Sequence, residues 1–337
     1  MNVFFTFSLS GMIFLSSVAS ASAGEALRLG TAPAGSLSFT FGAALSQLIG
    51  KHTDMRVEVL PQGDVVALPL MESREMDLIA IANDALGYAY DGKGIYEKQT
   101  DGRGFDLRVL ALGARYPATI VVAGDSGIKD YRGLKGKRVV LDYATQQAFS
   151  LGSRASLVSG GLRESDVTVL SASNIQTAVQ LLLERKADGI FGRIGMPALR
   201  RLEANRKGAM YLSSGEERWE EVQRISNAYL PMKLKKPFGV PEGAVFVAQN
   251  LSLAARPDLP EEIAYKIVKV LWERESDLAK HHPQFCHLVK ERFASEVSTA
   301  PYHPGAIRFF SEKGIWLNKM QARQENLLYR YGRLAIR

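Results

Sequence analysis

The sequence has a single cysteine, Cys286, and only five histidines among its 337 residues. One thiol excludes an internal disulfide and any metal cluster built from several cysteines. The composition, 46% hydrophobic and 23% charged, is that of a globular chain and excludes a disordered or collagen-like one. A chain of this length exceeds one comfortable core, so we expect two lobes.

The chain also lacks the short motifs of several enzyme classes. It contains no G-x-S-x-G nucleophile elbow, no G-x-G-x-x-G dinucleotide motif and no P-loop. We therefore expect no enzymatic activity and no cofactor. A metal site is an alternative, because His281, His282, Cys286 and His287 lie close together in the sequence. Pro283 interrupts a helix there and a second ligand cluster is missing, so we expect no metal.

Long apolar stretches are missing except at the N-terminus. Residues 3–23 carry no charge and end in Ala19–Ala23, a run of small residues that a signal peptidase accepts. We expect residues 1–23 to be a secretory signal peptide and the protein to be periplasmic, although the usual positive charge before the apolar run is absent. An uncleaved membrane anchor is the alternative, because about 20 apolar residues can span a bilayer.

Basic residues outnumber acidic ones by 42 to 35, which gives a formal charge of +7. Such a balance permits nucleic acid, an anionic membrane or an acidic small molecule as partner. From Lys313 to Arg337 there are six basic residues and one acidic residue, so much of the excess lies at the C-terminal end. We expect no nucleic acid partner, and the basic tail suits a contact with a membrane surface or a permease as well as it suits attraction of the solute.

Short apolar runs alternate with helical patterns, which predicts an α/β fold with mixed, mostly parallel sheets flanked by helices. Strands are expected at residues 27–30, 56–60, 78–82, 107–112, 119–123, 137–141, 167–170, 189–191, 210–212 and 245–248. Helices are expected at residues 41–49, 64–71, 146–159, 174–185, 260–280 and 307–320, with Asp64 and Asn174 as N-caps. The chain is expected to cross between lobes near residues 119–123 and 245–248.

Loops that follow the predicted strands carry the candidate ligand-binding residues. Open α/β sheets bind ligands at the carboxyl ends of their strands, where the free N–H groups of helix N-termini suit a carboxylate. The candidates are Gly35, Ser36, Ser38, Phe39, Gln62, Gly63, Asn83, Asp84, Tyr143, Thr145, Gln146, Gln147 and Arg193. Turn geometry explains Gly35 and Gly63 equally well. Arg115 and Arg193 each follow a predicted strand, where either can pair with a carboxylate or form a surface ion pair.

Five segments, in order along the chain, resemble one known family. They are LRLGTAPAGSLSFTFGAALSQLIGKH (27–52), VEVLPQGDVVALPLMESREMDLIAIANDALGYAYDGKG (57–94), GIKDYRGLKGKRVVLD (127–142), LPEEIAYKIVKVLWE (259–273) and YHPGAIRFFSEKG (302–314). The last is the most specific. Through these segments the chain is similar to the TAXI-type solute-binding proteins of TRAP transporters.

The resemblance implies a two-lobed type II periplasmic binding fold with a hinge. Lobe I is expected to comprise residues 25–122 plus 247–337, and lobe II residues 123–246. It further implies a receptor, expected to be a monomer, that closes over a small organic acid or amino acid and delivers it to TRAP membrane subunits. A sensor that passes its closed state to a signalling protein and an enzyme on the same fold are the alternatives.

The ligand-facing loops depart from the pattern usual in that family. Ser36–Phe39 stands where the family has Gly-Thr-Tyr-Tyr, and Gln62–Val65 stands where it has Thr-Gly-Gly-Ser. Ala82–Asp84 replaces Gln-Ser-Asp, and Thr145–Ala148 replaces Gly-Ser-Gly-Thr. The family's usual ligand therefore does not carry over directly. Arg193, where the family tends to have a small or neutral residue, is expected to supply a replacement charge.

Overall fold

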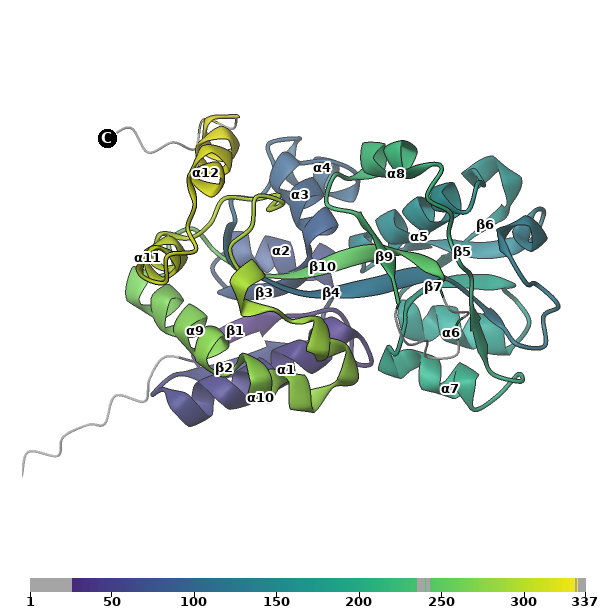
Figure 1. Cartoon of the computed structure of the whole chain (residues 1–337), viewed down its shortest axis with the longest axis horizontal. Helices are drawn as coiled ribbons and strands as arrows, with labels where there is room; N and C mark the ends of the chain where they lie inside the picture. Colours follow the sequence, from purple (N-terminus) through teal and green to yellow (C-terminus); the bar gives the residue numbers. More distant parts are fainter. Residues whose placement is uncertain (1–25, 235–239, 241–242, 331, 333–337) are drawn as a thin grey trace, which may run out of the picture.

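The computed structural model describes residues 26–234, 240, 243–330 and 332. The expected signal peptide at residues 1–23 lies outside them. The described chain forms two α/β lobes side by side, joined by two long central strands, β4 (Arg108–Ala123) and β10 (Val245–Ala255) (Figure 1). Within the described ranges, no helix combines the length and apolar character that crossing a membrane requires.

Lobe I is built on parallel strands that adjoin the two central ones. Its strands are β1 (Ala26–Gly30), β2 (Arg56–Leu60) and β3 (Leu78–Ala82), in the order β2-β1-β3-β10-β4. Helices on one side of the sheet are α1 (Leu37–His52), α9 (Glu261–Glu273) and α10 (Glu275–His281). Those on the other side are α2 (Asp64–Glu72), α3 (Asn83–Asp91) and α4 (Ile95–Thr100). The outer end carries α11 (Pro304–Glu312) and α12 (Asn318–Arg330).

Lobe II repeats this plan with the far half of β4 at its centre. Its strands are β5 (Arg138–Tyr143), β6 (Thr168–Ala172), β7 (Gly189–Arg193) and β8 (Ala209–Tyr211), while β9 (Leu230–Lys233) pairs with β10. Its helices are α5 (Gln147–Ser159), α6 (Ile175–Leu183), α7 (Arg200–Glu203) and α8 (Trp219–Ile225). Short 3₁₀ turns across the two lobes are Tyr131–Leu134, Glu164–Asp166, Pro197–Leu199, Pro283–His287 and Lys290–Arg292.

The central strands are longer than the sequence predicts. The strands expected at 107–112 and 119–123 form one continuous strand, β4, which pairs with β10 up to Tyr116 and with β7 from Ala118 onward. Pro117, which has no N–H to donate, therefore lies where the strand changes lobes. The strand expected at 245–248 likewise extends to Ala255, because its second half pairs with β3 and β4. Every residue of β10 is buried.

Two expected helices are each divided. The helix predicted at 260–280 breaks at Arg274 into α9 and α10, and the one predicted at 307–320 breaks near Gly314, whose φ of +69° suits glycine. Asn174 caps α6 as predicted, with its side chain accepting from the Thr177 N–H at 3.0 Å. The expectation that Asp64 is an N-cap is wrong: Gly63 holds that position and Asp64 begins α2.

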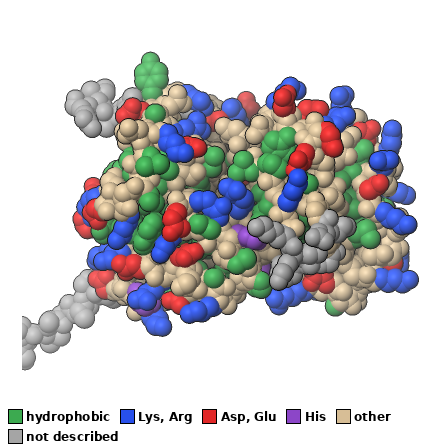
Figure 2. All heavy atoms as spheres, viewed as in Figure 1, with side chains coloured by type: hydrophobic (Ala, Val, Ile, Leu, Met, Phe, Trp, Pro, Cys, Tyr) green, Lys and Arg blue, Asp and Glu red, His purple; other side chains and the backbone are tan. Residues whose placement is uncertain are grey.

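The surface mixes both signs of charge. Figure 2 shows acidic and basic side chains interspersed over both lobes on the face viewed. Among the described residues, no three His, Cys, Asp or Glu side chains are grouped so that they could hold a metal ion. Helix α10 ends at His281, so His282 and Cys286 share no α-helical face.

Candidate functional site

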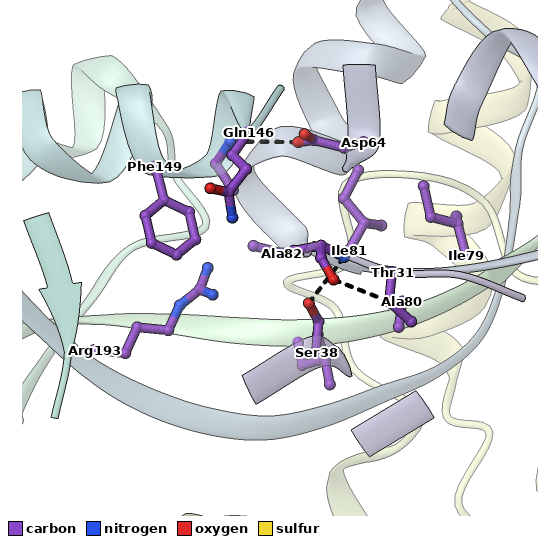
Figure 3. Close-up of a pocket in the computed structure, with 13 residues that line it drawn as sticks. Thr31, Ser38, Asp64, Ile79, Ala80, Ile81, Ala82, Gln146, Phe149 and Arg193 are labelled. Carbon is purple, nitrogen blue, oxygen red and sulfur yellow. Dashed lines mark hydrogen bonds between the residues drawn. The ribbon is translucent and has the colours of Figure 1, made fainter. Parts of the chain in front are cut away.

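A small pocket lies between the lobes, where β1, β3, β5 and β7 end. Its lining residues are Thr31, Ala32, Ser38, Asp64, Ile79, Ala80, Ile81, Ala82, Gln146, Ala148, Phe149, Arg193 and Leu251 (Figure 3). The free volume is about 20 Å³, which holds one or two water molecules. The lobes are thus closed on one another, and a solute of amino-acid size needs them further apart.

Arg193 is the cation of this pocket. It is the last residue of β7 and is only 3% exposed. Its guanidinium lies 4.8 Å from the centre of the Phe149 ring, and its Nε donates to Gln249 Oε1 at 3.0 Å. Figure 3 shows the guanidinium pointing into the pocket. A buried charge requires a compensating partner, and that partner lies behind Gln249.

The compensating charge is Asp84, at the start of α3. Its Oδ2 accepts from Gln249 Nε2 at 3.0 Å and from the Tyr229 hydroxyl at 2.6 Å. Burial raises the pKa of Asp84, while Tyr229 and the charge of Arg193 oppose the shift. Burial lowers the pKa of Arg193, and Asp84 opposes that shift. Gln249 on β10 therefore links an acid of lobe I to a base of lobe II.

Gln146 supplies a second donor to the pocket. Its Oε1 accepts from the Ile175 N–H at 2.9 Å, which fixes the amide orientation. Its Nε2 is buried and makes no hydrogen bond to the described residues. Figure 3 shows this nitrogen and the Arg193 guanidinium pointing into the same space beside Phe149. A buried donor without a partner costs free energy, so this space suits a ligand that carries an acceptor.

Asp64 of lobe I reaches across to helix α5 of lobe II. Its Oδ1 accepts from the Gln147 N–H at 3.1 Å, and its Oδ2 from the Ala148 N–H at 3.4 Å and from the Tyr96 hydroxyl at 3.0 Å. Burial raises the pKa of Asp64 to about 6, against the lowering effect of these hydrogen bonds. The carboxylate thus caps a helix that follows it by more than eighty residues in the chain.

Asp64 should make the closed protein less stable as the pH rises. Because the pKa of Asp64 is higher in the folded chain than in the unfolded chain, its contribution to the unfolding free energy is greatest below pH 3.8. This contribution falls as the pH rises and is lost once the pH passes about 6. The loss is about 3 kcal/mol. We expect Asp64→Asn to flatten the pH dependence of the unfolding free energy, measured by urea denaturation. Asp54→Asn, with an 84% exposed side chain, is the control. If the unfolding free energies of Asp64→Asn and wild type changed with pH in parallel, this pH dependence would not come from Asp64.

A third polar group lies at the N-terminus of α1. Ser36 caps this helix, since its Oγ accepts from the Phe39 N–H at 3.1 Å. Ser38 Oγ lies 3.2 Å from Ser36 Oγ and accepts from the Ala32 N–H at 3.2 Å. The loop after β1 is therefore held by the hydroxyls of Ser36 and Ser38, of which Ser38 lines the pocket.

Three of the predicted binding residues, Ser38, Gln146 and Arg193, line the pocket. Four others lie at contacts between the lobes. The Gly35 carbonyl accepts from the Ala198 N–H at 3.0 Å, and Gly63 faces the Thr145 carbonyl so closely that a Cβ there would lie 2.2 Å from its oxygen. Gln147 binds Asp64 through its backbone N–H.

The other six predicted residues do not line the pocket. Asn83 donates to the Val297 carbonyl at 2.8 Å and accepts from Thr299, away from the pocket. The Tyr143 hydroxyl accepts from the Phe191 N–H at 3.0 Å, and Gln62 is exposed. The remaining three, described above, are Ser36, Phe39 and Asp84.

Several lining residues escaped the sequence analysis. The sequence predicts Asp64 only as a helix cap, and Phe149 lies inside a predicted helix, where an aromatic residue indicates core. Residues 79–82 belong to the fully buried strand β3, and all four line the pocket. A signal existed for Asp64 alone: a charged residue directly after Pro-Gln-Gly at the end of a strand.

The fold and the pocket define a two-lobed α/β protein with a polar site between its lobes. The chain belongs to the NMT1-like family, whose model matches residues 29–314.

Several solved structures are similar to this chain. They include the alkanesulfonate-binding protein SsuA from Xanthomonas axonopodis pv. citri bound to MOPS (16% identity, 93% of this chain and 96% of that one, TM-score 0.46). Holo ArgBP from T. maritima matches at 14% identity over 74% and 89% of the two chains, with a TM-score of 0.44. An ancestral arginine-binding protein bound to arginine matches at 19% over 77% and 97%, with a TM-score of 0.46. These identities and TM-scores do not show what this chain binds, so the binding site proposed below rests on the geometry of this chain.

Proposed function

We propose that the protein is a solute-binding protein, not an enzyme, that captures a small carboxylate between its lobes. The observation that carries this proposal is the convergence of the Gln146 amide nitrogen and the buried Arg193 guanidinium on one space (Figure 3). Both groups are donors, and a guanidinium matches the two oxygens of a carboxylate. An organic acid or an amino acid offers that group.

Binding would work by closure of the two lobes. β4 and β10 form the only strand connections between the lobes in the described chain, so they are the natural hinge. Hydrogen bonds already cross the gap: Tyr229 donates to Asp84, and Tyr88 donates to the Ile225 carbonyl at 3.0 Å. A solute held by Gln146 and Arg193 of lobe II and by the loop after β1 in lobe I would add contacts on both sides.

The delivery step follows from the resemblance of the sequence to TAXI-type proteins. We propose that the closed protein presents its solute to TRAP-type membrane subunits outside the cytoplasm, after removal of residues 1–23. We also propose the lobe limits 25–122 plus 247–337 and 123–246, and the change of β4 from pairing with β10 to pairing with β7 near Pro117 supports the first of these boundaries.

The direct test is ligand binding by the protein without its first 23 residues. A thermal-shift screen would compare small carboxylates with their amides, for example butyrate with butyramide. Binding to the native state raises the melting temperature, by an amount equivalent to about 2.7 kcal/mol at one hundred times Kd. We expect shifts with acids and none with the amides. If amides stabilised the protein as well as acids, or if no acid did, the proposed function would fall.

Gln146→Glu should weaken binding of the best acid from that screen by more than tenfold. The substitution keeps the acceptor for the Ile175 N–H but replaces the donor that faces the pocket with a carboxylate oxygen. Two like charges in a buried site cost several kcal/mol. Isothermal titration calorimetry measures the change, with Gln47→Glu on the exposed side of α1 as the control. Equal affinity of Gln146→Glu and wild type would remove Gln146 from the site.

A further inference from the structure

The N-terminus of α5 is already occupied by a carboxylate that belongs to the protein. In open α/β proteins the N–H groups at such a helix start are a ready place for a ligand's anionic group. Here the N–H groups of Gln147 and Ala148 donate to Asp64, which reaches them from the other lobe. Gln146, at the N-cap position, makes no side-chain cap of its own.

We propose that Asp64 is an internal ligand: its carboxylate takes the place of a solute's anionic group at α5, holds the lobes closed without solute, and restricts the pocket to solutes with one carboxylate. The proposal deepens the proposed function, on which its statement about solutes rests.

The geometry supports a built contact. Asp64 is 8% exposed, and both of its oxygens are used. Tyr96, from α4 of the same lobe, donates to Oδ2 and so orients the carboxylate toward α5. The residue before it, Gly63, has a φ of +86° and lies against the Thr145 backbone, which brings the two loops within contact distance. A side chain in position 63 would prevent this approach.

The charges of the site favour a solute with a single negative group. Arg193 is the one cation among the described residues that line the pocket, and Asp84 already balances it through Gln249. Asp64 adds a second acid at the opposite side, toward α5 (Figure 3). A monocarboxylate can pair with Arg193 and Gln146. The second carboxylate of a longer diacid would meet Asp64 instead of free N–H groups, and that repulsion costs several kcal/mol.

The size of the pocket agrees with an internal ligand. With Asp64 in place the free volume is about 20 Å³, which is too small for a solute of carboxylate size while the lobes keep these contacts. A solute must therefore compete with the Asp64 contact for closure. A ligand shifts such an equilibrium only by its difference in affinity for the two states.

The experiment compares Asp64→Ala and Asp64→Asn with wild type in two measurements. Small-angle scattering without solute reports closure. Calorimetry with the pairs butyrate and succinate, pentanoate and glutarate, and hexanoate and adipate reports selectivity. The same two substitutions at Asp54, whose exposed side chain lies two residues after the end of α1, are the controls.

We expect Asp64→Ala to have a larger radius of gyration than wild type without solute. We also expect the preference for one carboxylate over two to fall at least tenfold in both variants. Should Asp64→Ala fail to fold, the isosteric Asp64→Asn still tests selectivity. Wild-type dimensions together with wild-type selectivity would overturn the proposal. If none of the acids binds any of the proteins, the carboxylate function fails, while the scattering still decides whether Asp64 closes the lobes.

Discussion

Replacing Arg193 with methionine is expected to abolish carboxylate binding and to lower the unfolding free energy by about 3–5 kcal/mol. Methionine keeps an apolar chain of similar length against Phe149 but removes the charge. Asp84 then remains buried with no cation to balance it, and an unbalanced buried charge is among the most destabilising changes known. Urea denaturation and calorimetry with the best carboxylate measure the two effects.

A second substitution, Asp84→Asn, separates the effect of Arg193 on stability from its role in carboxylate binding. In Asp84→Asn the amide oxygen can still accept from Tyr229 and Gln249, so the hydrogen bonds survive without the charge. We expect the double variant Arg193→Met/Asp84→Asn to recover most of the stability and none of the binding. A double-mutant cycle gives the coupling energy directly.

Arg115 provides the matched control for Arg193. It lies on the central strand β4 and, like Arg193, donates to a side-chain amide oxygen, Asn250 Oδ1, at 3.2 Å, but it is only partly buried. Arg115→Met should change stability by about 1 kcal/mol or less and leave binding intact. Loss of binding in Arg115→Met, or a double variant that binds normally, would contradict the role given to Arg193.

The sequence predicts the strands of the fold well and their extent less well, while α3, α4, α7 and α8 stand where it predicts no helix. Apolar runs locate all the strands of the continuous ten-stranded sheet except β9, and Asn174 marks the start of α6. The features of the strands that the sequence does not predict depend on tertiary pairing. β4 reads as two strands because Gly113 to Pro117 contains a glycine and a proline, yet the chain stays extended there since β10 pairs with it on one side of Pro117 and β7 on the other.

The sequence also predicts part of the candidate site: some residues that line the pocket, but not their hydrogen-bond partners. Placing candidates at the carboxyl ends of strands locates Ser38, Gln146 and Arg193 in the pocket, because that rule depends only on the order of strands and helices. It does not locate the partner of each candidate. Asp64 and Gln147 are 83 positions apart, and no local pattern in the sequence records that the lobes bring them together. Asp84 needs Tyr229 and Gln249, which are farther still.

Closure itself can be tested at Gly63. Alanine in this position would place its Cβ 2.2 Å from the Thr145 carbonyl oxygen, a distance that no adjustment of a flexible side chain can relieve, because both groups are backbone-bound. The lobes must then stay further apart. We expect Gly63→Ala to show a larger radius of gyration in scattering and to bind the best carboxylate at least tenfold more weakly, since a solute held by only one lobe loses the contacts of the other.

Backbone strain is the other effect of alanine at this position, because the φ of +86° and ψ of 155° are adopted almost only by glycine. Gly208→Ala tests backbone strain alone. The φ of Gly208 is +91°, and a Cβ there would meet no atom of the described residues within 4 Å. Gly208→Ala should therefore lose about 1–3 kcal/mol of stability while keeping wild-type closure and affinity. If Gly63→Ala closes and binds like Gly208→Ala, the contact between Gly63 and Thr145 does not limit closure. A Gly63→Ala that stays open while Gly208→Ala closes would locate the closing contact at the loops that follow β2 and β5.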